Sequence, residues 1–186
     1  MTSINYTFVT QSDNKLREAE LILRRSLQRC DLDLPELQAV DVEDVVVHKA
    51  LHAYQAIGRK PVLIEDTGLY FEAFNGLPGA LVKWFLKRTE TEGMCRMLDP
   101  FPTRKAWAKT IVAVYDGQLS LFVGRVDGEI ALHPRGDQGF GWDTIFIPDG
   151  ETRTFGEMAP EEKMQYSMRR RAFQAMAEFE SIRREE

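Results

Sequence analysis

The first 60 residues of this sequence alternate between short apolar runs and helical repeats. Residues 6–10 have the composition of a short strand, and residues 14–29 repeat apolar side chains every three or four positions, as a helix does. A second helical repeat ends near residue 57, before Gly58, and the apolar run at 61–64 predicts a buried strand. Strands that alternate with helices are typical of an α/β fold.

The second half of the chain changes to a hairpin pattern. Residues 110–115 and 119–126 flank the pair Asp116-Gly117, which is a strong turn signal, and a further turn is expected at Asp127-Gly128. The other expected elements are a turn at 75–79, helices at 80–88 and 89–98, a strand at 144–147, and helices after Gly156 with a break near Ser167. We therefore predict one α/β domain over residues 1–186, with a mixed sheet, helices on its faces, and a cleft between two lobes.

Charge and composition exclude several classes of protein. The formal net charge is −5, which argues against a protein whose main task is to coat nucleic acid. No apolar run approaches the length of a transmembrane helix. The two cysteines make neither a disulfide framework nor a four-thiolate zinc site. We expect a reduced, cytoplasmic protein that binds neither nucleic acid nor membranes.

The turn between the first strand and the first helix is a candidate phosphate site. It runs from Thr10 through Ser12 to Lys15, and such a turn presents free backbone N–H groups at the positive end of a helix. Lys15 adds a positive charge, although the glycines of a Walker A loop are missing. Plain capping of the helix by Ser12 or Asp13 is the alternative interpretation.

Two adjacent acids, Glu65 and Asp66, follow the apolar run at 61–64. Ligands of open α/β sheets bind beyond the carboxyl ends of strands, and adjacent acids there call for Mg²⁺ or a lysine nearby. A metal or catalytic site and an exposed turn are both open at this point.

Two further segments carry recognition chemistry. Phe140 and Trp142 have the residue types of an aromatic slot for a planar base, with Asp143 to read its edge, or they are core aromatics beside a glycine-rich turn. Lys163 and Arg169 offer cations for phosphates or base carbonyls, or they lie on a solvated basic helix face.

Taken together, these segments resemble the inosine triphosphate pyrophosphatase family. The matching motifs occur in the family's order and span about residues 8–172. They are Phe8-Val9-Thr10 with Lys15, Asp33 to Gln38, Pro61 to Leu69, Gly76 to Gly79, Lys83 to Leu86, Phe140 to Asp143, Glu157-Met158 and Glu162-Lys163. The resemblance implies an inosine-triphosphatase-like fold, usually in a homodimer. It also implies Mg²⁺-dependent hydrolysis of noncanonical purine nucleoside triphosphates (ITP, dITP and XTP) to the monophosphate and pyrophosphate.

The resemblance also implies roles for individual residues. Asp66 matches the acid that binds metal or activates the attacking water, Glu65 lies beside it, and Glu36 matches a second metal-binding acid. Lys15 matches the phosphate loop, and the implied catalytic residues are Asp66, Glu65 and Lys15. The other implied substrate-binding residues are Thr10, Ser12, Lys49, Lys83, Phe140, Gly141, Trp142, Asp143, Lys163, Ser167, Met168 and Arg169.

Two departures from the family pattern bear on the substrate. Gln11-Ser12 replaces the family's Gly-Asn in the phosphate loop, and Met168 replaces the histidine of its Ser-His-Arg stretch. An apolar Met cannot supply a polar contact to the base. Two alternatives therefore remain: the same reaction on a modified or pyrimidine triphosphate, as in the related Maf-type enzymes, and a nucleotide-binding protein with little turnover.

Overall fold

The structure is a computed structural model in which residues 5–185 are described. Its elements are β1 (Thr7–Val9), α1 (Asp13–Leu23), β2 (Gln28–Cys30), α2 (Val42–Ala56), β3 (Val62–Phe71), η1 (Glu72–Phe74), β4 (Pro78–Gly79), α3 (Val82–Arg96), β5 (Lys105–Tyr115), β6 (Leu119–Ile130), β7 (Phe146–Pro148), η2 (Phe155–Glu157), α4 (Pro160–Tyr166) and α5 (Met168–Glu185). The sheet has the strand order β2-β1-β3-β5-β6-β7, and β4 pairs with β3. β1 is parallel to β2 and β3, whereas β4 and β7 are antiparallel to their partners, so the predicted mixed sheet and α/β class are confirmed.

The described chain divides into two compact units. Unit 1 comprises the residues up to Thr67, Thr110–Gly124 and those from Arg169 on, and unit 2 comprises Gly68–Lys109 and Arg125–Met168. Strands β3, β5 and β6 each contribute residues to both units. Two units match the two predicted lobes, while a single domain over residues 1–186 stays a prediction.

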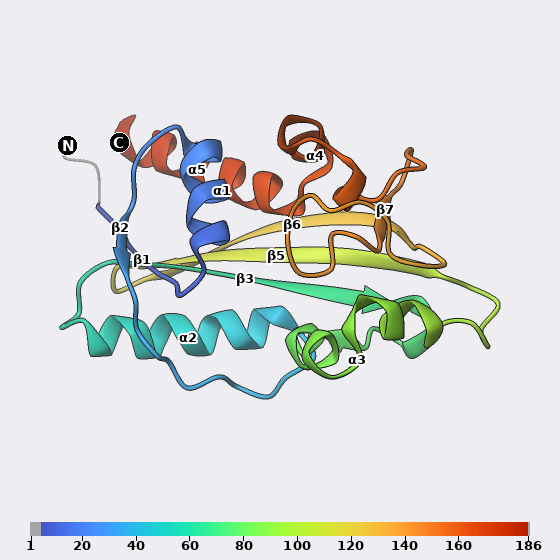
Figure 1. The fold of residues 1–186 in the computed structure, drawn as a ribbon. Coiled ribbons are helices and arrows are strands. Elements are labelled where there is room, and N and C mark those ends of the chain that lie inside the picture. Colours follow the sequence, from blue (N-terminus) through green and yellow to red (C-terminus); the bar gives the residue numbers. More distant parts are fainter. Residues whose placement is uncertain (1–4, 186) are drawn as a thin grey trace. The chain divides into compact units, whose positions relative to one another are not determined.

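Unit 1 is a layered α/β structure. Helix α2 lies on one side of its strands, and α1 and α5 lie on the other (Figure 1). On the side of α1 and α5, Phe8 of β1 meets Phe173 of α5 edge-on, with 6.2 Å between ring centres. The apolar cluster there consists of Tyr6, Phe8, Ala19, Leu63, Val112, Val114, Phe122, Ala172, Phe173 and Met176. Burial of this set is what fixes α1 and α5 on the strands.

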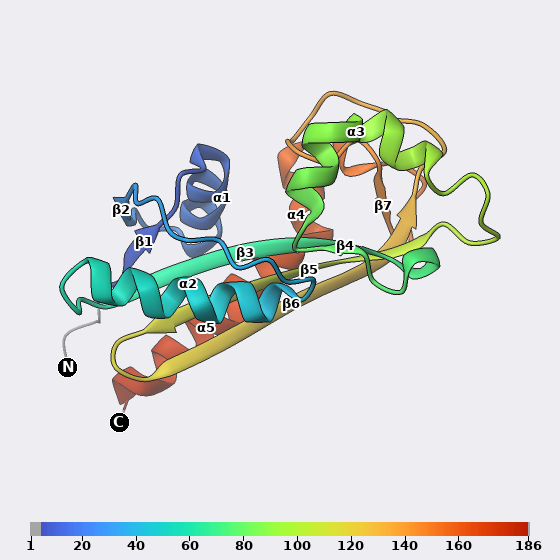
Figure 2. The same cartoon turned by 90° about the horizontal axis from the view of Figure 1, so that it is seen from below.

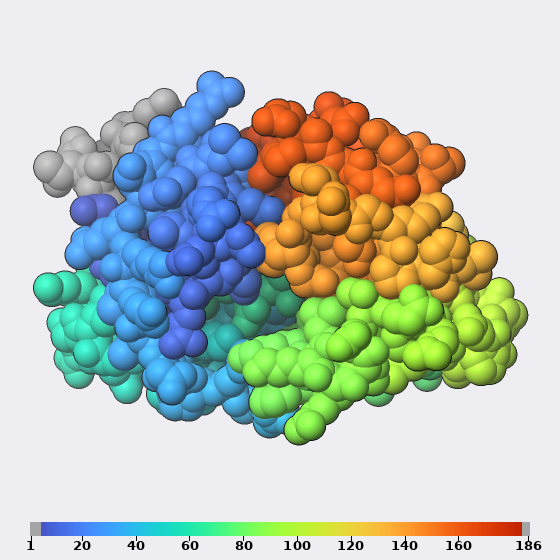
Figure 3. All heavy atoms as spheres, in the orientation of Figure 1, coloured from blue at the N-terminus to red at the C-terminus, as the bar shows by residue number. Residues whose placement is uncertain are grey.

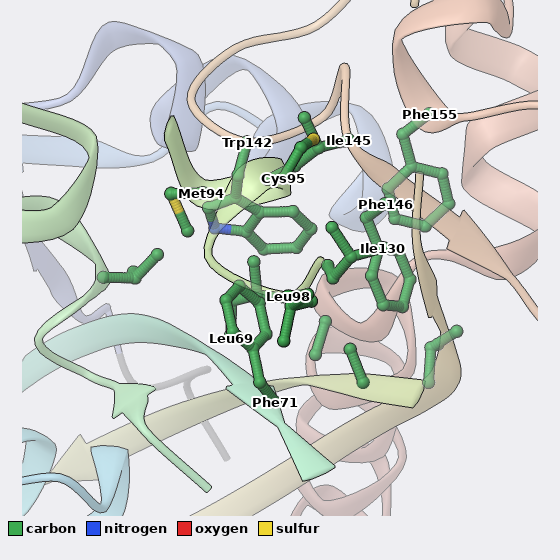
Figure 4. Packing of buried hydrophobic residues seen from close by; sticks show 14 of the residues in the cluster. Leu69, Phe71, Met94, Cys95, Leu98, Ile130, Trp142, Ile145, Phe146 and Phe155 are labelled. Atoms are coloured by element: carbon green, nitrogen blue, oxygen red, sulfur yellow. The ribbon is translucent and has the colours of Figure 1, made fainter. Parts of the chain in front are cut away.

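Unit 2 contains a second apolar core, in which aromatic rings pack among aliphatic side chains. Trp142 lies among Met94, Leu98 and Phe146, and Phe155 packs on Phe146 from the other side (Figure 4). Figure 2 shows α3 and β7, two of the elements that contribute residues to this core. The described helices include none with the length and hydropathy needed to cross a membrane.

The sequence misjudged where several elements end. Residues 14–29 were expected to be one helix, but α1 stops at Leu23 because Arg24 takes a left-handed conformation (φ 51°), and Gln28–Cys30 forms β2 against β1. The turn expected at Asp127-Gly128 is also wrong, since β6 continues to Ile130. Gly128 instead allows β6 and β7 to lie close together, because a Cβ at this position would lie 2.1 Å from the carbonyl oxygen of Ile147 on β7.

The most consequential error concerns β3. The sequence predicted a strand at residues 61–64, with an exposed turn at the two acids as one interpretation, whereas the structure has one continuous strand from Val62 to Phe71. Other predictions are confirmed: α3 is kinked at Glu90, where two helices were expected, and the C-terminal helices break at Ser167.

Candidate functional site

A cluster of opposite charges lies in unit 1, around the middle of β3. Glu65 and Asp66 are adjacent on the strand, and the cations that face them come from other elements: Lys15 from α1, Lys49 from α2 and Arg169 from α5. Three helices thus deliver one cation each to two carboxylates on a buried strand.

Lys15 is held by the first turn of α1. Ser12 caps this helix by accepting a hydrogen bond from the Lys15 backbone N–H at 3.2 Å, and Thr10 Oγ1 accepts from the Ser12 N–H at 3.1 Å. The Lys15 ammonium donates to Asp66 Oδ1 at 3.0 Å and to the Glu65 carbonyl at 3.2 Å. The predicted cap is confirmed, and the same turn aims Lys15 at the two acids.

Lys49 joins two carboxylates that are distant in sequence. Its ammonium lies 2.7 Å from Asp66 Oδ2 and 3.0 Å from Glu36 Oε1. Glu36 belongs to the segment between β2 and α2, most of whose residues are exposed, and Figure 3 shows this light-blue segment on the surface. Glu36 and Asp66, the predicted pair of metal ligands, therefore converge on one cation.

The charges of the cluster are stabilised mutually. Burial by itself would raise the pKa of Asp66, but the attraction of Lys15 and Lys49 outweighs it and holds that pKa far below its ordinary value. Burial opposes the charged form of both lysines too, yet Asp66, with Glu65 for Lys15 and Glu36 for Lys49, raises the pKa of each. Asp66 is therefore an anion and both lysines are cations near neutral pH.

Arg169 is buried within unit 1 and is held by acids. Its guanidinium pairs with Glu18 of α1 and lies 3.3 Å from both Glu65 Oε1 and Thr67 Oγ1. The prediction that Arg169 touches the base is not tested by these contacts, but they show which protein groups hold it.

The donor set of this cluster fits a hard divalent cation. Glu36 and Asp66 supply carboxylate oxygens, the ligand type that Mg²⁺ prefers, and they already share one cation, Lys49. Glu65 Oε2 is buried and accepts no hydrogen bond, although it lies 3.2 Å from the Lys15 ammonium. The three cations face four carboxylates, those of Glu18, Glu36, Glu65 and Asp66, so the cluster has one excess negative charge that a divalent cation would reverse.

Unit 2 contains a second, smaller charge site. Lys163 of α4 and Asp143 are both nearly inaccessible, with 2.8 Å between Nζ and Oδ2. Asp143 Oδ2 also accepts from the Phe140 N–H at 2.7 Å, and the Lys163 ammonium lies 5.0 Å from the centre of the Phe140 ring. A Cβ on Gly139 would lie 2.1 Å from Asp143 Oδ2, so the glycine leaves room for the carboxylate.

The structure separates the other residues expected around the base. Phe140 is half-buried, and Gly141 is exposed, whereas Trp142 is buried in the apolar core, as the alternative interpretation had it (Figure 4). Met168 is also buried in that core. Ser167 is buried as well. Lys83, which is expected to face the phosphates, is exposed on α3, with its Nζ 5.8 Å from the Trp84 ring centre. Base contacts by the first five residues and a phosphate contact by Lys83 stay predictions.

Sequence reasoning missed three members of the unit 1 cluster: Glu18, Thr67 and Thr110. Thr110 offered a signal, because it is a polar residue directly before a run of buried apolar residues, Ile111 to Val114, in β5. Glu18 offered none, since a glutamate on an exposed-looking helix position is common.

The chain is similar to proteins of one known family along most of its length. The model of the Ham1 family matches residues 6–179. An inosine triphosphate pyrophosphatase from Kluyveromyces lactis is 43% identical over 92% of this chain and 93% of its own length. A dITP/XTP pyrophosphatase from Methanopyrus kandleri is 38% identical over 92% of this chain and 94% of its own. The solved structure of a HAM1 protein from Coxiella burnetii superposes with a TM-score of 0.82 at 26% identity, covering 97% of this chain and all of that one.

Proposed function

Because the chain belongs to the Ham1 family, we propose that it hydrolyses noncanonical purine nucleoside triphosphates, namely ITP, dITP and XTP, to the monophosphate and pyrophosphate. The relatives are named for ITP and for dITP and XTP, and they match this chain along nearly its whole length. The cluster on β3 supports the same reaction, because it combines cations for phosphates with a carboxylate that stays ionised.

The single observation that carries the proposal is the pairing of Lys15 and Lys49 with the two oxygens of Asp66. An ionised carboxylate between two ammonium groups fits phosphoryl chemistry, in which anionic oxygens must be neutralised while a water is positioned. We assign Lys15 and Lys49 to the phosphates. The Ser12 cap and the N-terminus of α1 add backbone donors beside Lys15.

Asp66 is the residue that we assign to the attacking water. Its carboxylate accepts from Lys15, Lys49 and the Thr67 N–H, which fixes its orientation. Glu36 and Asp66 would hold Mg²⁺, which when bound neutralises phosphate oxygens and lowers the pKa of a bound water.

Base recognition is assigned to the unit 2 site. The half-buried Phe140 ring provides a stacking face, and the Lys163–Asp143 pair provides polar groups of fixed orientation beside it. A buried polar pair rejects a base that leaves its groups unmatched, so these residues are suited to selecting the base edge.

A panel of nucleotides tests the proposal. Release of pyrophosphate and of nucleoside monophosphate is measured for ITP, dITP, XTP, GTP, ATP and the pyrimidine triphosphates, with Mg²⁺ and after EDTA. We expect kcat/KM to be highest for the first three and activity to disappear with EDTA. Preference for a pyrimidine or modified base indicates the Maf-like alternative, and tight binding with negligible turnover indicates a nucleotide-binding protein.

The proposal includes a homodimer and a cytoplasmic location. Light scattering coupled to size-exclusion chromatography tests the first, and cell fractionation tests the second.

A further inference from the structure

A chain of buried hydroxyl groups connects β5 to the charge cluster of unit 1. Thr110 of β5 is fully buried, and its Oγ1 lies 2.7 Å from Thr67 Oγ1 on the neighbouring strand β3. Thr67 Oγ1 lies in turn 2.6 Å from Glu65 Oε1. A buried threonine hydroxyl needs a hydrogen-bond partner, and Thr67 Oγ1 provides it for Thr110.

The direction of each hydrogen bond follows from counting protons. Thr67 donates its one hydroxyl proton to Glu65 Oε1 at 2.6 Å. Thr67 therefore accepts from Thr110, and its second lone pair accepts from Arg169 at 3.3 Å. The Thr67 hydroxyl thus makes one donation and two acceptances, the full capacity of a hydroxyl group.

We propose that Thr110 is a positioning residue: through Thr67, its hydroxyl fixes the Glu65 carboxylate between Arg169 and Lys15, and so sets where Lys15 presents its charge to the substrate. This deepens the proposed function, because Lys15 is assigned there to the phosphates.

The geometry at Glu65 supports this assignment. Oε1 is held by Thr67 and Arg169, and this leaves Oε2 directed at the Lys15 ammonium 3.2 Å away. A partial rotation of the carboxylate would move both oxygens away from these partners and disturb both cations. Without the Thr110 hydroxyl, the Thr67 hydroxyl loses the donor that fixes its rotamer and can turn away from Glu65, so the carboxylate loses its single orientation. Glu65 then acts through Lys15 and Arg169, without contact to the reacting atoms.

Isosteric substitutions distinguish a positioning role of Thr110 from a purely structural one. Thr110→Val keeps the shape and removes the hydroxyl, whereas Thr110→Ser keeps the hydroxyl. We expect Thr110→Val to lower kcat/KM for ITP by roughly 5- to 10-fold, the worth of one hydrogen bond, mainly through KM. The affinity for inorganic pyrophosphate, measured by titration calorimetry with the full-length protein, is expected to fall by a similar factor, and Thr110→Ser to stay within about twofold of wild type by the same arithmetic.

Two further variants control the result. Thr7→Val makes the same change at a buried threonine of β1 outside the cluster, and it is expected to leave both readouts unchanged. The double variant Thr67→Val/Thr110→Val is expected to lose no more than Thr67→Val alone, because Thr110 acts through Thr67.

The proposal is overturned if Thr110→Val and Thr110→Ser have the same kcat/KM and pyrophosphate affinity, even when Thr110→Val unfolds in less urea. A loss confined to kcat, with KM and pyrophosphate affinity unchanged, also overturns it. Should Thr110→Val fail to fold, equal values for Thr67→Val and Thr67→Ser overturn it instead. If wild type hydrolyses no nucleotide, the proposed function fails, while the pyrophosphate titration still decides the role of Thr110.

Discussion

Replacement of Asp66 by Asn removes one charge from the centre of the cluster while keeping its shape. The Asn amide oxygen can still accept from Lys15 and from the Thr67 N–H in place of Oδ1. In the wild type the Lys49 ammonium donates to Asp66 Oδ2 at 2.7 Å. In the variant the amide nitrogen replaces Oδ2, so two donors face each other. One charge-assisted hydrogen bond is lost and a second is weakened.

The structure sets the size of two effects of Asp66→Asn. A hydrogen bond to a charged group contributes about 1.5–3 kcal/mol, so the free energy of unfolding of the protein alone should fall by about that amount at pH 7. Loss of the group that orients and deprotonates the attacking water should lower kcat by about 10²- to 10⁴-fold. The expected fall in kcat is therefore much larger than any fall that partial unfolding of the variant could cause.

The assay for Asp66→Asn measures kcat and KM for ITP with Mg²⁺, together with urea unfolding. Asp149→Asn is the matched control, because it makes the same change at an exposed acid in the turn after β7. Near-normal kcat in folded Asp66→Asn protein would refute the assignment of the water to Asp66.

The pH dependence of stability provides an independent check of the Asp66 environment. Asp66 has a pKa lowered by Lys15 and Lys49 in the folded protein and of about 3.9 when unfolded. Its contribution is therefore fully present above pH ~4 and is lost as the pH falls toward the lowered pKa. The difference in unfolding free energy between wild type and Asp66→Asn should shrink on going from pH 6 to pH 3; a constant difference contradicts the ion pairing.

Three further predictions concern unit 2. Lys163→Met leaves the buried Asp143 charge without its cation, so the free energy of unfolding measured in urea should fall by about 3–5 kcal/mol. A fall of less than about 1 kcal/mol contradicts this prediction. Gly139→Ala should destabilise the protein and raise KM, because a Cβ would meet Asp143 at φ +75°; unchanged urea midpoint and KM would show that the loop simply shifts. Met168→His should widen the preference for ITP and XTP over GTP and ATP, while a histidine in the apolar core should lower stability by about 1–3 kcal/mol; unchanged ratios of kcat/KM exclude a base contact at this position.

Local patterns were enough to predict the α/β class and the residue types of the cluster. The Ser12 cap and the break at Ser167 were read from capping and periodicity alone. Glu36, Lys49 and Asp66 were expected to act together only through the family resemblance, since nothing in their spacing shows that they meet.

The continuity of β3 was not predictable from its own residues. A run ending in Glu65 and Asp66 normally ends a strand, because charged groups on a buried strand are costly. Here the cost is offset by Lys15, Lys49 and Arg169, and these cations arrive from helices far along the chain. A local reading of residues 61–71 contains none of them.

The division of the chain into two units explains why the role of a single residue could not be predicted from its short motif. The boundary falls between Thr67 and Gly68, and again between Met168 and Arg169. In the stretch Ser167-Met168-Arg169, the methionine side chain packs in the unit 2 core, whereas the arginine is held by acids of unit 1. Met168 and Arg169 are adjacent in sequence but lie in different packing environments. A substitution at one of them therefore does not imply a changed role for the other. The replacement of histidine by Met168 is therefore compatible with an intact Arg169–Glu65–Lys15 arrangement.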